Sequence, residues 1–344
     1  MSRAEATVPA RPTLEEVATA AGVSRATVSR VVNGSPKVSP QVLAAVNEAI
    51  ERLGYVPNRA ARSLAARHTM AIALVVPEDA HRVFGDPYFA DVVQGISDRL
   101  DDSEYVLNLQ LTHPSSPSEK TRNYLRGGNV DGAIVVSHHT GDHFLTGLDP
   151  DLPVVFGGRP MLGDGSAQLA PYYIDADNLG GARTATQHLV DLGRTRIATI
   201  TGPEDMPAAI DRETGWRQVL AEAGLPDDRL ARGDFTIAGG LRAGLQIVRE
   251  HPDLDAIFVA SDFMARGALL AFEQAGLRVP QDVAVVGFDN SLYATRGEIG
   301  LTTVDQHTVQ MGQAMADKLL RLLAGEPVEH ATVLPTTLVV RESA

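Results

Sequence analysis

The sequence predicts a small all-α head followed by a large α/β body made of two doubly wound parallel-sheet lobes. Helix-capping signals follow one another within residues 13–57, without strand-like runs between them. From about Met70, apolar runs of four to seven residues alternate with amphipathic segments, a pattern typical of parallel sheets covered by helices. Roughly 270 residues are long for one open sheet, so we expect two similar lobes with a cleft between them.

Net charge divides the chain at the same place. Residues 1–67 carry nine basic and five acidic side chains, a net charge of +4, whereas the whole chain carries −13. The remainder therefore carries −17. A basic head on an acidic body is expected of a protein that touches phosphates with one end only. Chance clustering on a solvated surface is the alternative, and the motifs inside the head decide between the two.

Composition excludes several classes of protein. Apolar residues make up 44% of the chain, enough to bury a sizeable core. No apolar run is long enough for a membrane helix and no signal-peptide core follows Met1, so we expect a cytoplasmic protein. The absence of cysteine excludes disulfides, thiol catalysis and Cys-based metal sites. No phosphate-loop or nucleophile-elbow motif occurs, so we expect no cofactor, no catalytic residue and no enzymatic reaction.

The head begins after a polar, flexible tail at residues 1–12. Thr13 and Glu16 form a capping box for a first helix, which Gly22 ends. Ser24 caps a second helix across this tight turn, so the pair describes a helix-turn-helix. A third helix begins at Ser39-Pro40 and ends at Gly54.

The second helix carries the side chains suited to DNA. Arginine reads guanine with two hydrogen bonds in the major groove, and small polar residues permit close approach. A helical bundle without a ligand is the alternative on this pattern alone. The exposed residues are Arg25, Ala26, Ser29 and Arg30, and the residues placed to bind phosphates are Ser24, Thr27 and Asn33.

The segments Thr13–Asn33, Leu53–Asn58 and Ala61–Leu64 closely resemble the lactose-repressor (LacI/GalR) family of transcriptional regulators, and the resemblance extends essentially from Thr13 to Ser343. It implies that three residues of the second helix face bases while three others hold the DNA backbone. The base-facing residues are Arg25, Ala26 and Arg30, and the backbone-holding residues are Ser24, Thr27 and Asn33.

The resemblance also implies a hinge helix at Asn58–Ala65, with Asn58 and Ala61 in the DNA-contacting segment and Leu64 as a wedge in the minor groove. Eight residues are too few for a stable isolated helix, so the segment would order only when two copies meet on DNA. Packing of Leu64 on the body is the alternative. The expected domains are the helix-turn-helix at 13–57, the hinge helix and linker at 58–68, and an effector-binding and dimerisation domain at 69–344.

In the body, the apolar runs predict strands and the amphipathic segments predict helices. The strands are Ala71–Val76, Tyr105–Leu111, Ala133–Val136, Val154–Phe156, Ile197–Ile200, Ala256–Ala260 and Val283–Val286, and Thr337–Val340 is also strand-like. The helices are Tyr88–Leu100, Asn178–Leu192, Arg212–Ala223, Gly239–Arg249, Asp262–Ala275 and Thr308–Leu323.

A binding site is expected where the parallel strands end. Asp262 and Asp289 each follow a predicted strand, and their carboxylates can accept hydroxyl hydrogen bonds from a polyol. Each could instead cap a helix or a turn. Tyr88, Phe89 and Phe235 offer aromatic faces on which a sugar ring can stack.

Four stretches of the body also resemble the periplasmic-binding-protein-like core of the same family: Asp86–Phe89, Ile174–Ala182, Ala260–Asp262 and Val286–Asp289. This resemblance implies that Arg159, Arg212 and Gln306 face the ligand. Arg212 is expected to open the helix after Ile197–Ile200, where its guanidinium offers a planar set of donors. His307 stands where the family frequently has proline, which leaves the local geometry open. The run from His138 to His143 contains potential metal ligands, but Gly141 breaks their helical spacing, so we interpret it as a polar loop and expect no metal.

These predictions combine into a homodimeric repressor of sugar-utilisation genes. Its heads would bind a near-palindromic operator, and its cleft a small carbohydrate that changes the separation of the hinge helices. Whether the sugar releases or promotes DNA binding stays open. No heptad repeat follows Thr337–Val340, so we expect a dimer. The alternatives are a solute-binding protein, which needs no DNA-binding head, and a sugar-acting enzyme with paired carboxylates.

Overall fold

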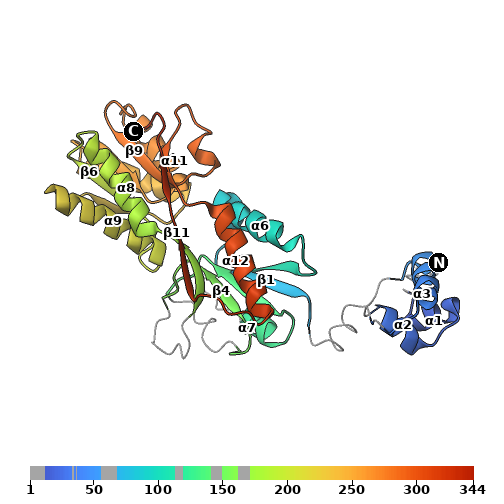
Figure 1. Ribbon diagram of the computed structural model, residues 1–344. Coiled ribbons are helices and arrows are strands. Elements are labelled where there is room, and N and C mark those ends of the chain that lie inside the picture. The colour runs from blue at the N-terminus through green and yellow to red at the C-terminus, as the bar shows by residue number, and fades with distance from the viewer. Residues whose placement is uncertain are drawn as a thin grey trace, which may run out of the picture. The chain divides into compact units, whose positions relative to one another are not determined.

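The computed structural model describes residues 12–32, 35, 37–55, 68–112, 119–140, 149–161 and 171–344. The chain forms two compact units, Met1–Thr69 and Met70–Ala344 (Figure 1). Within the described ranges, no helix combines the length and the apolar character that crossing a membrane requires.

The first unit is the helical head, with helices α1 (Leu14–Ala21), α2 (Arg25–Val32) and α3 (Pro40–Leu53). The predicted capping box is confirmed, because Thr13 Oγ1 accepts from the Glu16 backbone N–H while Glu16 accepts from that of Thr13. Left-handed glycines end α1 and α3 as expected. The core of the head contains Val17, Val28, Val31, Val46, Ala49 and Tyr55.

The second unit contains two sheets of six strands each within the described residues, which confirms the predicted two-lobed class. The N-lobe sheet has the order β11-β5-β4-β3-β1-β2, and the C-lobe sheet the order β12-β10-β9-β8-β6-β7. All pairs are parallel except the antiparallel β10 and β12. The N-lobe strands are β1 (Ala71–Val76), β2 (Val106–Leu111), β3 (Gly132–Val136), β4 (Val154–Gly157), β5 (Tyr172–Ala176) and β11 (Ala331–Leu334). The C-lobe strands are β6 (Ile197–Thr201), β7 (Leu230–Arg232), β8 (Ala256–Val259), β9 (Ala284–Asp289), β10 (Thr302–Asp305) and β12 (Thr337–Val339).

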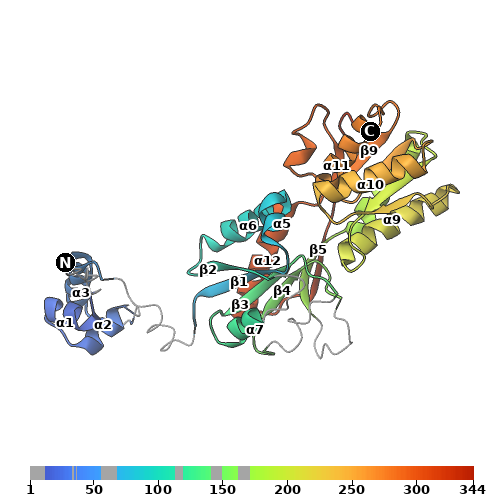
Figure 2. The ribbon, with the colours of Figure 1, turned by 180° about the vertical axis from the view of Figure 1, so that it is seen from behind.

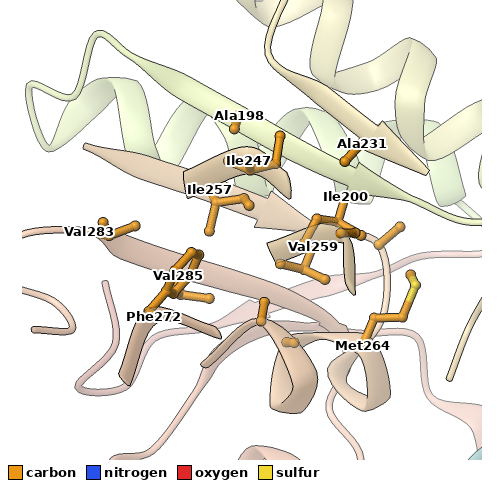
Figure 3. Close-up of a cluster of buried hydrophobic side chains, with 14 of the residues drawn as sticks. Ala198, Ile200, Ala231, Ile247, Ile257, Val259, Met264, Phe272, Val283 and Val285 are labelled. Carbon is orange, nitrogen blue, oxygen red and sulfur yellow. The ribbon is translucent and has the colours of Figure 1, made fainter. Parts of the chain in front are cut away.

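Helices cover both faces of each sheet, because alternate strand residues point to opposite sides. In the C-lobe, Ile257 and Val259 face α10 and α11, whereas Ala256 and Phe258 face α8 and α9. Figure 3 shows the first of these cores, and Figure 2 shows α9 and α10 from behind. The C-lobe helices are α8 (Asn178–Asp191), α9 (Pro207–Ala223), α10 (Ile237–Glu250) and α11 (Asp262–Gln274). The N-lobe helices are α5 (Ala80–Gly85), α6 (Pro87–Leu100), α7 (Glu119–Arg126) and α12 (Thr308–Leu323).

Three connections pass between the lobes. The chain leaves the N-lobe after β5 to enter α8, returns after β10 to enter α12, and leaves again between β11 and β12. It first enters the N-lobe at Met70, whose backbone N–H donates to Asp131 Oδ2 at 3.0 Å and whose carbonyl accepts from Val106. The neighbouring strands β3 and β2 therefore hold the start of β1.

Some sequence predictions were incomplete. β5, β10 and β11 carry hydroxyl or acidic side chains among their apolar residues, so they do not read as apolar runs, and β7 has three residues only. The start predicted for the helix with Arg212 was wrong, because α9 begins at Pro207. Arg212 therefore lies in the second turn of α9.

Candidate functional site

A cavity of about 690 Å³, part of it open to solvent, lies where the strands of both lobes end. In each lobe the strand order reverses beside β1 or β6, and such switch points are where α/β sheets bind ligands. Both lobes contribute polar side chains, and Tyr88 and Phe235 contribute aromatic rings. The polar lining includes Arg82, Asp86, Ser137, His138, Arg159, Asp175, Asn178, Arg212, Ser261, Asp289 and Gln306.

Arg212 is the centre of the polar network in this cavity. Its side chain is buried, and its Nε donates to Asn178 Oδ1 at 2.9 Å. One terminal nitrogen donates to the Ala260 carbonyl at 2.6 Å and to Asp289 Oδ1 at 3.4 Å, and the other donates to Gln306 Oε1 at 3.3 Å. Because Arg212 is bonded to groups from α8, β8, β9 and the segment after β10, it fixes the positions of cavity residues from several elements.

The buried charge of Arg212 is compensated by its neighbours. The ring of Phe288 lies 3.7 Å from the guanidinium carbon, a cation–π contact. Burial lowers the pKa of Arg212, and the nearby Asp289 carboxylate opposes this effect. Burial likewise raises the pKa of Asp289 well above its usual value, although Arg212 opposes the shift. Gln306 Nε2 also donates to Asp289 Oδ1, at 2.7 Å. Loss of either charge would leave the other without its counter-charge in a largely buried site.

Two further carboxyl groups line the N-lobe side. Burial raises the pKa of both Asp86 and Asp175 to about 6, and backbone hydrogen bonds oppose the shift. Asp86 Oδ1 accepts from the Tyr88 N–H at 3.1 Å, and Asp175 Oδ2 accepts from the Arg159 N–H at 2.9 Å. At neutral pH these carboxylates offer acceptors toward the cavity.

Polar contacts join the lobes beside the cavity, and we call two of the side-chain contacts the cross-lobe clasp. Arg159 of the N-lobe donates to both carboxylate oxygens of Asp211 on α9, each at 2.9 Å. His139, which follows β3, contacts Asp205 of the C-lobe at 2.9 Å through Nδ1 and Glu78 of its own lobe at 3.2 Å through Nε2. The clasp therefore holds the two lobes together beside the cavity.

Six of the eight predicted ligand-facing residues line the cavity: Tyr88, Arg159, Arg212, Phe235, Asp289 and Gln306. The structure does not bring the other two to it. Phe89 packs in the N-lobe core, because it follows Tyr88 on a helix and points elsewhere. Asp262 is fully buried, and it accepts from Thr303 Oγ1 at 2.6 Å and from the Ser291 N–H at 2.8 Å.

Sequence reasoning missed several lining residues. Asp86, Asp175 and Asn178 lie in body stretches whose family resemblance was evident, so the signal was present but no role was assigned to them. His138 lies in the run interpreted as a polar loop, yet only 5% of its surface is exposed. No group of His, Asp and Glu side chains in the described part of the chain has an arrangement that would hold a metal ion.

On the head, Ser24 before α2 and Arg25, Ala26 and Arg30 on α2 are exposed to solvent. Thr27 is half-buried, and so is Ser29, which was predicted to be exposed. Ser24 Oγ accepts from the Thr27 N–H at 3.2 Å and lies 2.9 Å from its hydroxyl. Arg25 Nε forms an exposed ion pair with Glu15 of α1 at 2.9 Å. The predicted contacts Asn33, Asn58, Ala61 and Leu64, together with the hinge helix, lie outside the described residues.

Comparisons with known proteins match the chain along almost its whole length. Residues 13–58 match the model described as bacterial regulatory proteins, lacI family, and residues 186–344 match a periplasmic binding protein-like domain. The HTH-type transcriptional regulator CelR of Thermobifida fusca is 45% identical over 97% of this chain and 98% of its own length. A solved CelR–cellobiose complex is 43% identical, with a TM-score of 0.76 over 97% of this chain and 100% of that one. A lac repressor dimer bound to operator and the anti-inducer ONPF is 29% identical, with a TM-score of 0.86 over 97% of this chain and 99% of that one.

Proposed function

The chain belongs to the lacI family of bacterial regulatory proteins, which are DNA-binding transcriptional regulators, and from this premise we propose that it represses sugar-utilisation genes under the control of a small carbohydrate. The observation that carries the proposal is the cavity between the lobes, whose hydrogen-bonding groups and aromatic rings come from both sides. Carboxylates, amides and aromatic faces are what a neutral polyhydroxylated ligand requires. A ligand that contacts both lobes favours their closed arrangement over an open one.

We propose that the ligand of this site is a disaccharide. The cavity is lined by polar and aromatic side chains from both lobes, as small-molecule sites commonly are. Its lining resembles that expected for a sugar, and a relative that is 43% identical was solved with cellobiose. Cellobiose is therefore the first candidate effector. Tyr88 and Phe235 would stack on the sugar rings, Asp289 and Gln306 would bind hydroxyls, Arg159 would close over them, and Arg212 would hold these groups in place.

On the head, the exposed face of α2 is the proposed DNA-reading surface. Arg25, Ala26 and Arg30 would face bases, while Ser24 and Thr27 hold phosphates. The family resemblance adds Asn33 and a hinge segment within 58–68, with contacts by Asn58 and Ala61 and a wedge by Leu64. A homodimer would place two such heads on the half-sites of a near-palindromic operator.

The remaining expectations belong to the same proposal. The two compact units support a division into a helix-turn-helix domain at 13–57 and an effector-binding and dimerisation domain at 69–344, joined by the hinge and linker. The cavity-lining carboxylates are engaged in hydrogen bonds that position them for binding, and we infer a binding protein rather than an enzyme. A role on operator DNA places the protein in the cytoplasm.

A selection experiment tests this function. Full-length protein is incubated with random duplex DNA, and the bound sequences are amplified with and without cellobiose in a panel of mono- and disaccharides. We expect a symmetric site to be enriched, and one saccharide to change its affinity at constant salt. Failure to enrich any two-fold symmetric site would overturn the proposed function, and turnover of a saccharide would favour the enzyme alternative.

A further inference from the structure

His138 carries a buried nitrogen that its protein neighbours leave unused. Its Nε2 lies 3.3 Å from the Arg159 carbonyl oxygen, which can only accept, so Nε2 carries the ring proton. Nδ1 of the neutral ring is then a lone-pair acceptor. It is buried, and in the described structure no hydrogen-bond donor reaches it.

His138 lines the cavity, and packing holds its ring in one orientation. Its face and edge pack against Phe156, with ring centroids 5.5 Å apart and planes at 72°. Gly158 lies beside its Cε1 atom, where a side chain at that position would contact the ring. Burial lowers the pKa of His138 to about 4, so the ring is neutral near pH 7. A fixed neutral imidazole is a directional acceptor.

We propose that His138 Nδ1 accepts a hydrogen bond from one hydroxyl of the bound ligand and thereby selects a neutral polyhydroxylated molecule. The inference rests on the proposed function and adds a specificity-determining residue to it. Among the cavity-lining residues described, the other buried side-chain nitrogen without a partner is Arg82 Nε, a donor. A hydroxyl group can satisfy either atom, because it both donates and accepts.

An anionic group or an ether oxygen cannot donate a hydrogen bond to His138 Nδ1, because it carries no proton. At the position that it contacts, His138 therefore discriminates a free hydroxyl from a phosphate ester. It also discriminates one particular hydroxyl from its methyl ether.

The first test observes the ring itself in the full-length protein. Imidazole nitrogens are labelled with ¹⁵N, and the resonances of His138 among the ten histidines are assigned with the His138→Gln variant. Without ligand at pH 7, we expect a neutral ring protonated on Nε2. On addition of cellobiose, the Nδ1 resonance should shift toward that of a hydrogen-bonded acceptor. A ring protonated on Nδ1, or a charged ring, overturns the inference.

The second test measures discrimination by calorimetric titration of cellobiose and its monodeoxy and mono-O-methyl analogues. For wild type, changing one hydroxyl should weaken binding by about tenfold or more. His138→Leu should bind cellobiose more weakly and lose discrimination at that hydroxyl alone, whereas His138→Gln, whose amide oxygen accepts, should keep part of it. An unchanged pattern in His138→Leu, or preference of wild type for a cellobiose phosphate, overturns the inference. If wild type does not bind cellobiose, the proposed effector falls, and the spectrum of the free protein still decides whether the acceptor exists.

Discussion

The exposed face of α2 and the cavity between the lobes both present arginine beside carboxylate, but in opposite surroundings. Arg25 and Glu15 on the head are both largely exposed, so water competes with their ion pair. Arg212 and Asp289 in the cavity are buried and share their hydrogen bonds with several neighbours. A substitution at one exposed head residue should therefore affect mainly the contacts of that residue. A substitution at one cavity residue should also disturb the neighbours that share its hydrogen bonds.

Removing Arg212 should give the largest effect. Arg212→Met leaves Asp289 buried without its counter-charge, and we expect a loss of about 3–5 kcal/mol in the free energy of unfolding of the two-lobed unit. Cellobiose binding should disappear with it. Calorimetric unfolding and ligand titration measure the two effects. Arg212→Lys is the matched control, since it keeps the charge without the planar donors. A variant Arg212→Met with wild-type stability and affinity would show that the network does not depend on its centre.

Removing Arg30 should affect DNA alone. If Arg30 reads a base, Arg30→Ala weakens binding to the selected operator by about 1–3 kcal/mol, while binding to random DNA changes much less. Cellobiose affinity should be unchanged, because the described residues that line the cavity all belong to the second unit. Mobility-shift titrations at one salt concentration compare the two DNAs. Equal losses on both would assign Arg30 to phosphate.

A change of pH should affect the clasp more than the head, because the clasp contains His139. Burial lowers the pKa of His139, but hydrogen bonds and charge from Glu78 and Asp205 outweigh it, so the net pKa is raised. The protonated ring can donate to both carboxylates, and the groups near it also include Arg82 through Glu78 and the neighbouring His138. The contribution of the His139 contacts to the clasp is complete below the usual pKa of histidine and is lost as pH rises through the raised value, whereas the Arg159–Asp211 pair persists.

We therefore expect cellobiose affinity to fall several-fold from about pH 6.5 to pH 9, a change on the scale of one weakened ion pair. His139→Gln should flatten this slope. Below about pH 6 the opposite slope should appear, because Asp86 and Asp175 take up protons and cease to be anionic acceptors. Titration calorimetry across this range checks both slopes, and a wild-type slope retained in His139→Gln would remove the clasp from the explanation.

The smallest effect is expected at the exposed pair of the head. Glu15→Gln releases Arg25 and removes a negative charge near the DNA-reading face, so operator binding should tighten by about twofold to fivefold. The gain should shrink at higher salt. Glu48→Gln, on the exposed part of α3, is the control for a change of net charge alone. Weaker operator binding by Glu15→Gln would mean that Glu15 orients Arg25 for its base.

The sequence predicted best those features whose signals are local, such as a helix cap or the end of a strand. The capping signals of α1 and α3 are local, so they specified those helices directly. Asp289 and Arg212 were predicted because strand ends and family resemblance both pointed to them. The residues misplaced or missed depend on tertiary contacts. Phe89 is turned away from the cavity by its helical position, and His138 is buried by the packing of Phe156 and Gly158, which no local pattern reports.

The entry of the chain at Met70 has a mechanical consequence. The two-lobed domain receives the preceding segment through β1 alone, and β1 belongs to the N-lobe. A rotation of the C-lobe therefore reaches the preceding segment through the N-lobe. Three chain connections cross between the lobes and restrict this rotation to a narrow set of axes, so under the proposed function a bound sugar would act on the head through β1.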